Sequence, residues 1–295
     1  MKNKISLFLD SGAFSAWSKG IEINIQEYIS FIKQHEKYID VYAVLDDILD
    51  PEKTLQNQKI MEDAGLKPLP CFHFGEDIKY IEYYLDNCDY IALGGMVPIS
   101  SKDLSVWLDN LFKNYICDKS GMPKAKVHGF GLTSLSLMFR YPWYSVDSTS
   151  WVIISHMGGV YVPRYKSGQW IYDGALWKIS VSTRSPDKLK AGKHIDTFPE
   201  TQKKHILNYF KSKGYQLGKS EFKFVSTSHK LKSNEKWVGK ATGDKREIEA
   251  IVEPGLCNDY TLRNEMNIIY YLDLEKNMPK WPWAFKPKGV KGFEL

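Results

Sequence analysis

The strongest constraint on the fold is a repeated alternation between short apolar runs and amphipathic stretches over residues 5–150. The apolar runs are 5–9, 41–45, 69–74, 90–93, 126–131 and 143–146. The amphipathic stretches between them are 25–38, 51–64, 78–85, 104–116 and 135–141. This alternation predicts strands and helices in βα units, and therefore a parallel sheet covered by helices.

Two architectures fit such a pattern, a doubly wound open sheet and a closed barrel. No GxGxxG or GxxxxGK[ST] follows the first apolar run, so a nucleotide-binding open sheet lacks its usual signature. Polar residues follow the strands at their carboxyl ends, where barrel enzymes build their sites. We therefore expect a TIM-type (β/α)8 barrel.

After residue 151 the pattern becomes irregular, with strand-like pieces at 160–165, 170–172 and 177–181 and helical patterns at 199–213 and 260–274. The barrel is therefore expected to be irregular in its second half. We expect residues 1–182 to hold the main part of the barrel and the active site. Residues 183–295 are expected to complete the barrel and to add a basic, nucleic-acid-facing elaboration.

Charge is unevenly distributed along the chain. The net charge is +5, but residues 184–247 contain sixteen Lys or Arg against seven Asp or Glu, so the remaining residues sum to −4. A basic segment beside a neutral-to-acidic body suggests an anionic partner held by one part of the molecule. The alternative is a solvated lysine-rich surface.

Cysteine usage and hydropathy indicate the cellular compartment in which the protein is expected. The four cysteines form no CxxC pair, which argues against a disulfide framework and a four-cysteine zinc site. No stretch approaches the roughly 20 apolar residues of a membrane span, so we expect no membrane partner. A reducing cytoplasm is the expected location, the host cytoplasm if a phage encodes the chain.

Chemistry-bearing residues cluster at the predicted strand ends. In a closed barrel these ends converge on one mouth, and three of them deliver a carboxylate. Carboxylates brought together in this way can attack an anomeric carbon, transfer protons and recognise the donor edge of a purine. Glycines at a strand end let a flat ring approach the backbone. The candidates are Asp10, Ser11, Asp46, Asp47, His73, Gly94, Gly95, His128 and Asp147.

Each candidate taken alone also has a simpler interpretation. Asp10 could cap the turn that it begins, and Asp46 or Asp47 could bind magnesium. His73 and His128 could be hydrogen-bonded pocket residues, and Gly94-Gly95 could be an ordinary turn. The conjunction of these residues at successive strand ends favours a functional site.

Four motifs in register resemble the tRNA-guanine transglycosylase superfamily over residues 5–150. Asp10-Ser11-Gly12-Ala13-Phe14 resembles the family's DSGGFQ signature, and Val44-Leu45-Asp46-Asp47 resembles its base-binding motif. Leu93-Gly94-Gly95-Met96-Val97 is similar to its GGLAVG turn. Gly129-Phe130-Gly131, followed by Tyr144-Ser145-Val146-Asp147, resembles the stretch that ends in the nucleophilic aspartate.

The resemblance implies a TIM barrel and a ping-pong base exchange. Asp147 would attack C1′ and expel guanine, and a 7-deazaguanine such as preQ0 or preQ1 would then attack the glycosyl-aspartate with help from Asp10. Asp46, Ser11 and the backbone at Gly94 and Gly95 would bind the base. His73 lies near the place of a base-reading glutamine, and Phe14 belongs to the first motif, so both join the substrate-binding set.

One departure bears on the substrate. Family members that act on tRNA carry a CxCxxC-plus-histidine zinc site in the C-terminal half, whereas this chain has only Cys257 after residue 150. Together with the short length and the lysine-rich second half, this looks most like the phage-type relatives that insert 7-deazaguanines into DNA. The expected partners are DNA and a free 7-deazaguanine, with neither a metal nor a cofactor.

Three alternatives stay open at this stage. The same exchange could act on tRNA or another RNA. A barrel of this kind could bind nucleic acid or a free base without turnover. A metal-dependent hydrolase could use Asp46, Asp47 and His73.

Overall fold

The structure of the 295-residue chain, a computed structural model, describes residues 6–132 and 134–287. The chain divides into two compact units. Unit 1 comprises Met1–Ser148 and Pro279–Leu295, and unit 2 comprises Thr149–Met278. The expected boundary between residues 182 and 183 therefore falls inside unit 2, because the β7–β8 hairpin of residues 159–180 packs within that unit.

Unit 1 is built on short parallel strands in sequential order. They are β1 (Phe8–Leu9), β2 (Val41–Tyr42), β3 (Cys71–His73), β4 (Tyr90–Gly94), β5 (Lys126–Gly129) and β6 (Ser145–Val146). β1 pairs with β2, and β3 to β6 pair in order. A parallel bridge between Ala43 and Leu69 joins the two sets. All six predicted strands are confirmed: β4 extends one residue beyond its prediction, the other five have shorter bounds, and the part of the first prediction at Ile5 lies outside the described residues.

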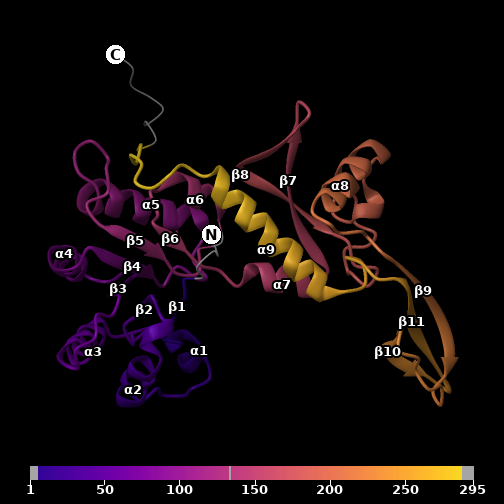
Figure 1. Ribbon diagram of the computed structural model, residues 1–295, viewed down its shortest axis with the longest axis horizontal. Coiled ribbons are helices and arrows are strands. Elements are labelled where there is room, and N and C mark those ends of the chain that lie inside the picture. The colour runs from indigo at the N-terminus through magenta and orange to yellow at the C-terminus, as the bar shows by residue number, and fades with distance from the viewer. Residues whose placement is uncertain (1–5, 133, 288–295) are drawn as a thin grey trace. The chain divides into compact units, whose positions relative to one another are not determined.

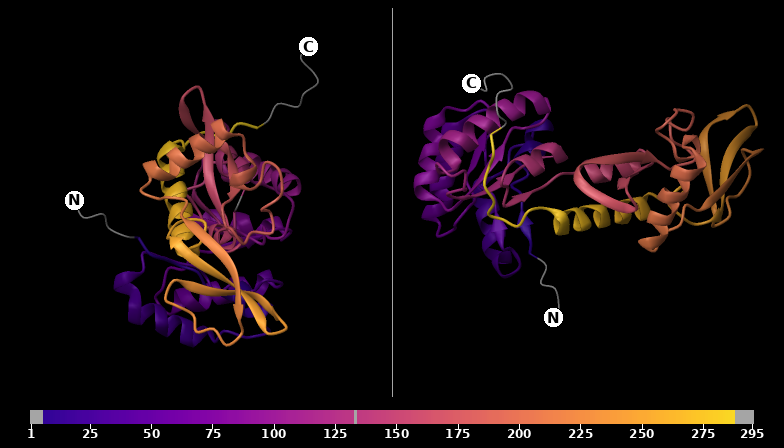
Figure 2. Two further views of the ribbon diagram at one scale, coloured as in Figure 1. Left: turned by 90° about the vertical axis from the view of Figure 1, so that its right-hand side faces the viewer. Right: turned by 90° about the horizontal axis from the view of Figure 1, so that it is seen from above.

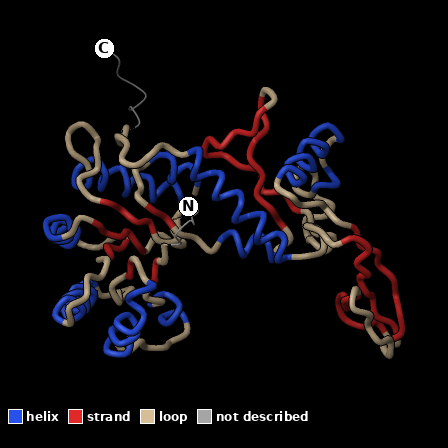
Figure 3. The backbone as a smooth tube through the Cα atoms, in the orientation of Figure 1, coloured by secondary structure: helices blue, strands red, loops and turns tan. Residues whose placement is uncertain are grey.

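Helices connect the strands as the periodicity predicts. They are α1 (Ala13–Ser18), α2 (Ile25–His35), η1 (Glu36–Tyr38), α3 (Pro51–Asp63), α4 (Ile78–Asn87), α5 (Ser101–Leu111), the π-helical turn η2 (Phe112–Ile116) and α6 (Leu135–Arg140). In Figures 1 and 3, α2, α3, α4 and α5 lie around the outside of the strands. The five predicted helices are confirmed, whereas the short α1 was not predicted.

Local chemistry explains where α3 begins and what it packs against. Asp50 caps it by accepting from the backbone N–H groups of Glu52 and Lys53, and Pro51 takes the first turn, where no N–H is needed. Met61 of α3 and Ile32 of α2 are fully buried in one cluster with Val44, which follows β2. Burying a side chain of this size stabilises the fold by about 1.5–3 kcal/mol.

Side chains of the first and fifth strands of unit 1 touch, which shows that the sheet curls. The Phe8 ring of β1 stacks on the His128 ring of β5, with centroids 4.4 Å apart and 21° between the planes. The same Phe8 meets Phe130 edge to face at 5.8 Å. The curl brings the carboxyl ends of non-adjacent strands toward one another, which positions the site described below.

Unit 2 combines helices with two antiparallel sheets. Its elements are α7 (Ser150–His156), β7 (Gly159–Lys166), β8 (Gln169–Ser180), η3 (Ile195–Thr197), α8 (Glu200–Ser212), β9 (Lys219–Ser226), β10 (Glu235–Thr242), β11 (Lys245–Glu253) and α9 (Tyr260–Asn277). β7 and β8 form a hairpin. Val160 and Ile179 of that hairpin pack with Ile206 of α8 and Met266 of α9 in a fully buried core. The predicted helices at 199–213 and 260–274 are confirmed.

The basic segment folds into a sheet that the sequence pattern did not predict. β9, β11 and β10 lie side by side as an antiparallel ribbon with β11 in the middle (Figures 1 and 2). Many of its side chains are exposed, including Phe224 and Lys240. On one face, the Arg246 guanidinium lies 5.1 Å from the centre of the Trp237 ring. The sheet therefore presents exposed lysines beside aromatic rings.

The chain ends its described course in unit 1. The N–H of Phe285 donates to the carbonyl of Gly121 at 2.8 Å, and its ring stacks on that of Tyr141 with centroids 5.3 Å apart. Among the described residues, no helix has the length and apolar character needed to cross a membrane.

Candidate functional site

Three aspartates follow strands β1, β2 and β6, and the charges of Asp46 and Asp147 act on Asp10. The pKa of Asp10 is raised above its ordinary value, chiefly because surrounding protein desolvates its carboxyl, and further because the carboxylates of Asp46 and Asp147 repel its charge. Asp10 is exposed as a residue, so the crowding acts on a carboxyl that solvent can still reach. The curled sheet has thus brought three carboxylates from separate strands into one electrostatic environment.

Asp46 belongs to a hydrogen-bonded chain that runs from β1 to the turn after β3. Ser11 donates its hydroxyl to Asp46 Oδ1 at 2.7 Å, and His73 Nε2 lies 3.0 Å from Asp46 Oδ2. On the other side of the ring, His73 Nδ1 lies 2.8 Å from Glu76 Oε1. Because the side chains of Asp46, His73 and Glu76 are 14%, 7% and 9% exposed, the chain is almost shielded from water.

The two carboxylates hold His73 in its charged form. Burial alone would lower its pKa, but the neighbouring Cys71 and the carboxylates of Asp46 and Glu76 raise the pKa of His73 overall. An imidazolium donates from both ring nitrogens, which matches an acceptor on each side. Asp46 is therefore a carboxylate whose orientation is set by Ser11 and His73, with lone pairs left for a further donor.

Gly94, the last residue of β4, and Gly95 after it provide the space in which the His73 ring lies. A Cβ on Gly94 would come within 2.7 Å of His73 Cδ2 and 2.8 Å of Cys71 Sγ. Gly95 has φ +66°, and a Cβ there would come within 3.1 Å of His73 Cβ. The sequence suggested that these glycines let a base approach the backbone. In the structure they also let β4 pass directly against the histidine.

Asp147 is held at the end of β6 and faces a buried histidine. Its Oδ1 accepts from the N–H of Gly131 at 2.7 Å, and about half of its side chain is exposed. His128 Nε2 lies 3.7 Å from the same oxygen, which is too long for a hydrogen bond. This nitrogen has no hydrogen-bond partner among the described residues, although it is buried.

The opposite side of the His128 ring is anchored. His128 Nδ1 lies 2.7 Å from Ser145 Oγ, and that oxygen lies 2.6 Å from the Tyr90 hydroxyl. Phe8 stacks on the ring. The ring is thus anchored on one side, while Nε2 stays unpaired in a buried position beside Asp147, which costs about 1–3 kcal/mol.

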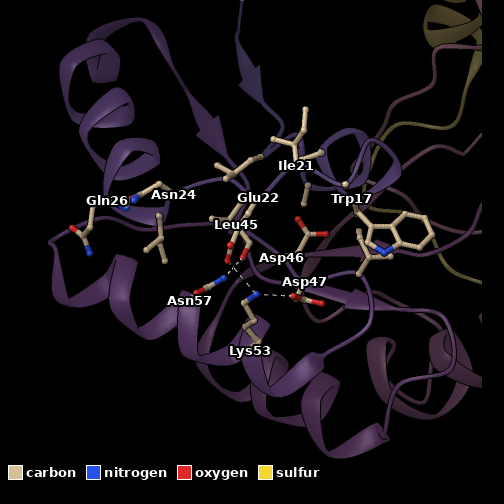
Figure 4. A pocket seen from close by; sticks show the side chains of 16 residues that line it. Trp17, Ile21, Glu22, Asn24, Gln26, Leu45, Asp46, Asp47, Lys53 and Asn57 are labelled. Atoms are coloured by element: carbon tan, nitrogen blue, oxygen red, sulfur yellow. Dashed lines mark hydrogen bonds and ion pairs between the residues drawn. The ribbon is translucent and has the colours of Figure 1, made fainter.

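A pocket of about 790 Å³ opens beside Asp46. Figure 4 shows Lys53 of α3 lying between the carboxylates of Glu22 and Asp47, with Asp46 and Trp17 also on the pocket wall. Pockets for small molecules commonly measure 300–1,000 Å³. Trp17 is 51% exposed and offers the pocket a flat aromatic surface, a feature that the sequence reasoning did not single out.

Two of the sequence candidates, Asp47 and Phe14, make no hydrogen bond to the chain of Asp46, His73 and Glu76. Asp47 points to Lys53 at 3.1 Å and accepts from the N–H groups of Leu49 and Asp50, so it shapes the turn before α3. Phe14 is 55% exposed on α1, packs beside Trp17 with ring centroids 6.0 Å apart, and does not line the pocket.

One group of side chains in the described residues offers metal ligands. Asp46, Cys71 and His73 present an oxygen, a sulfur and a nitrogen within 4.8 Å of one another. Cys71 thus takes the place that the hydrolase alternative gave to Asp47. Burial raises the pKa of the Cys71 thiol to about 11, so its sulfur would have to release a proton to bind a metal. The same atoms are satisfied by the hydrogen bonds between His73 and its carboxylates.

Comparison with known proteins adds no relative: no family model, no curated protein and no solved structure matches the chain. Only the sequence motifs and the geometry of the site therefore indicate the function.

Proposed function

We propose that the chain is a transglycosylase that exchanges guanine in DNA for a 7-deazaguanine through a covalent glycosyl-aspartate. The observation that carries the proposal is that contacts gather the ends of three strands: Ser11, next to Asp10, donates to Asp46 at 2.7 Å, and Phe8 of β1 stacks on the His128 ring that faces Asp147. Carboxylates crowded in this way disfavour one another unless a substrate uses them. The four sequence motifs that resemble the transglycosylase superfamily supply these same residues.

The chemistry divides into two displacements at C1′. A carboxylate oxygen of Asp147 forms a bond to C1′ while the C1′–N9 bond breaks, and the electron pair passes to guanine N9, which takes up a proton. The incoming 7-deazaguanine then loses its N9 proton, forms the new bond to C1′ and releases the Asp147 carboxylate. Asp10 serves the proton transfers, because its raised pKa keeps it closer to neutral pH than an ordinary aspartate.

Asp46 recognises the base in this proposal. A guanine presents two adjacent N–H donors, and a carboxylate held by Ser11 and His73 is oriented to accept them. Trp17 provides a surface on which a planar ring can stack. His128 positions or protonates a group next to Asp147, which accounts for its unpaired nitrogen.

The proposal extends to the fold and to the nucleic acid. The order of β1 to β6 and the contact between Phe8 and His128 support a barrel of the TIM (β/α)8 type. The exposed cations and aromatic rings of β9 to β11 support binding of nucleic acid through its phosphates. A guanine within a duplex must be extruded before its sugar can be attacked.

The test is exchange of labelled guanine into DNA and into tRNA, measured in parallel. Asp147→Asn should lose exchange by a factor of at least about 10³, as expected when a nucleophile is removed. Asp86→Asn is the matched control, since Asp86 is exposed on α4 and has no side-chain partner among the described residues. Incorporation into tRNA alone would replace DNA by RNA as the substrate. Absence of exchange with both, by folded protein, would refute the reaction.

A covalent adduct separates catalysis from binding. Wild-type protein incubated with its nucleic acid should retain it on a denaturing gel, whereas Asp147→Asn should not. Equal binding by both proteins without any adduct would favour a non-catalytic nucleic-acid or base-binding protein.

A further inference from the structure

Unit 2 contains a pocket of its own, formed from elements that are far apart in sequence. It measures about 550 Å³ and includes His156, Arg184, Lys236, Glu249, Asn258 and Tyr260 in its wall. These residues come from the end of α7, the loop after β8, the strands β10 and β11 and the start of α9. None of the residues in this pocket belongs to the site proposed above.

A buried carboxylate in this pocket lacks the partners that such a group needs. Glu249 is 2% exposed, and its one hydrogen bond is from the Thr183 hydroxyl at 3.1 Å. No ion pair within 4.0 Å reaches it in the described residues. Arg263, in the same wall, gives its hydrogen bonds to the backbone carbonyls of Ser155 and Leu256, and its charge acts on Glu249 without a hydrogen bond.

Glu235, on the neighbouring strand β10, is a buried carboxylate of the same sheet whose oxygens do have hydrogen-bond and ionic partners. It is 6% exposed and is met by His229 at 2.8 Å, by Lys223 at 3.4 Å and by the N–H of Lys232 at 3.0 Å. A carboxylate offers about four acceptor positions. Glu249 thus leaves acceptor capacity unused in a position where desolvation makes this costly, and the open space beside it is the pocket.

The remaining wall supplies a cationic rim and an aromatic surface. Arg184 is exposed and its side chain has no partner among the described residues, and Lys236 makes only a 3.4 Å contact with the Asn258 carbonyl. The rings of His156 and Tyr260 meet edge to face with centroids 4.8 Å apart, and Tyr260 is 53% exposed. A ligand for this pocket therefore needs N–H donors for Glu249, an anionic group for Arg184 and Lys236, and a flat apolar body.

We infer that this pocket binds a guanine nucleotide, free or within a strand. Guanine has two adjacent N–H donors on one edge, which a carboxylate accepts in parallel, whereas adenine, cytosine and uracil do not offer such a pair. The phosphate would meet Arg184 and Lys236, and the base would lie against Tyr260. The inference stands on residues of unit 2 and does not depend on the reaction proposed for unit 1.

The test is calorimetric titration of the full chain with GMP, AMP, CMP and UMP. GMP should bind at least about tenfold more tightly than the others, the discrimination expected from one bidentate pair. Glu249→Gln should remove this preference, whereas Glu253→Gln, an exposed change on the same strand, should keep it. Arg184→Gln should weaken GMP but not guanosine, and Lys166→Gln, an exposed change on β7 outside the pocket, should affect neither.

A stability measurement distinguishes a ligand site from a structural carboxylate. Without ligand, Glu249→Gln should melt at about the same temperature as wild type, because Glu249 receives one hydrogen bond, from Thr183, and no ion pair within 4.0 Å among the described residues. A lower melting temperature would assign Glu249 to the fold and overturn the inference. Equal affinity for all four nucleotides, or saturation by inorganic phosphate alone, would overturn it too.

Oligonucleotides distinguish the two sources of the ligand. A fluorescent oligothymidylate with one central guanine, compared with one that carries adenine there, reports whether a guanine within a strand occupies the pocket. A guanine preference lost in Glu249→Gln supports a nucleic-acid ligand, whereas a preference seen only with GMP supports a free nucleotide. Absence of preference in both assays refutes the inference.

Discussion

Replacing His73 by glutamine tests whether the Asp46–His73–Glu76 chain is charged. The change removes a cation that lies 3.0 Å and 2.8 Å from two largely buried carboxylates. Breaking a buried ion pair by removing one partner costs about 3–5 kcal/mol, a large part of the 5–15 kcal/mol by which a typical domain is stable. We expect His73→Gln to lower the free energy of unfolding by about that amount near pH 6.

The pH dependence follows from the direction of the shift. Since the folded pKa of His73 is raised, its contribution is complete below the unfolded pKa of about 6.5 and is lost as pH rises through the folded value. The difference between wild type and variant should therefore shrink above pH 6.5, by up to about 1.4 kcal/mol per pH unit.

Urea unfolding of both proteins between pH 4 and pH 9 measures this profile. His35→Gln is the matched control, because His35 contacts only the Phe31 ring, at 4.6 Å between centroids, and has no acidic partner among the described residues. A His73→Gln difference below about 1 kcal/mol that does not vary with pH would refute the charged chain. Loss of wild-type stability on adding a chelator would show a metal at Asp46, Cys71 and His73 instead.

Three further changes test the site. Asp10→Asn should raise the melting temperature at neutral pH by relieving repulsion from Asp46 and Asp147. This gain should vanish at acidic pH, where wild-type Asp10 is protonated, and exchange should fall by about 10²–10⁴, as measured in melts and labelled-guanine assays. His128→Phe keeps a ring against Phe8 but removes the unpaired nitrogen, so kcat should fall about 10- to 100-fold with little change in KM; an unchanged kcat would assign His128 to packing alone. Gly94→Ala should destabilise the protein by about 1–3 kcal/mol in urea unfolding, because its methyl group meets the His73 ring at 2.7 Å, and a neutral effect would contradict the tight packing.

Local patterns along the chain were sufficient to predict most elements of unit 1. Apolar runs of strand length and amphipathic stretches of helical length define the βα units, and Asp50-Pro51 marks the start of α3. The three aspartates were predicted as a group because the carboxyl ends of parallel strands lie at one edge of a sheet. Only the order of the strands and the residue that follows each strand are needed to predict this group of aspartates.

Other features depend on contacts that no local pattern encodes. Glu76 joins the chain because His73 lies between it and Asp46, with one ring nitrogen facing each carboxylate. The sequence shows only that residues 73 and 76 are polar and three positions apart. The strands β9 to β11 carry so many exposed charges that their alternation is weak, so the basic segment was interpreted by charge rather than as a sheet.

The sequence by itself determined where the strands and helices of unit 1 lie and which side chains stand at the strand ends. The tertiary structure alone decided that the sheet curls until Phe8 meets His128, that Asp47 turns away to Lys53, and that Glu249 is buried beside an open pocket. The physical reason is range. Periodicity and capping act over a few residues, whereas burial, desolvation and charge pairing are set by side chains that folding brings together from distant parts of the chain.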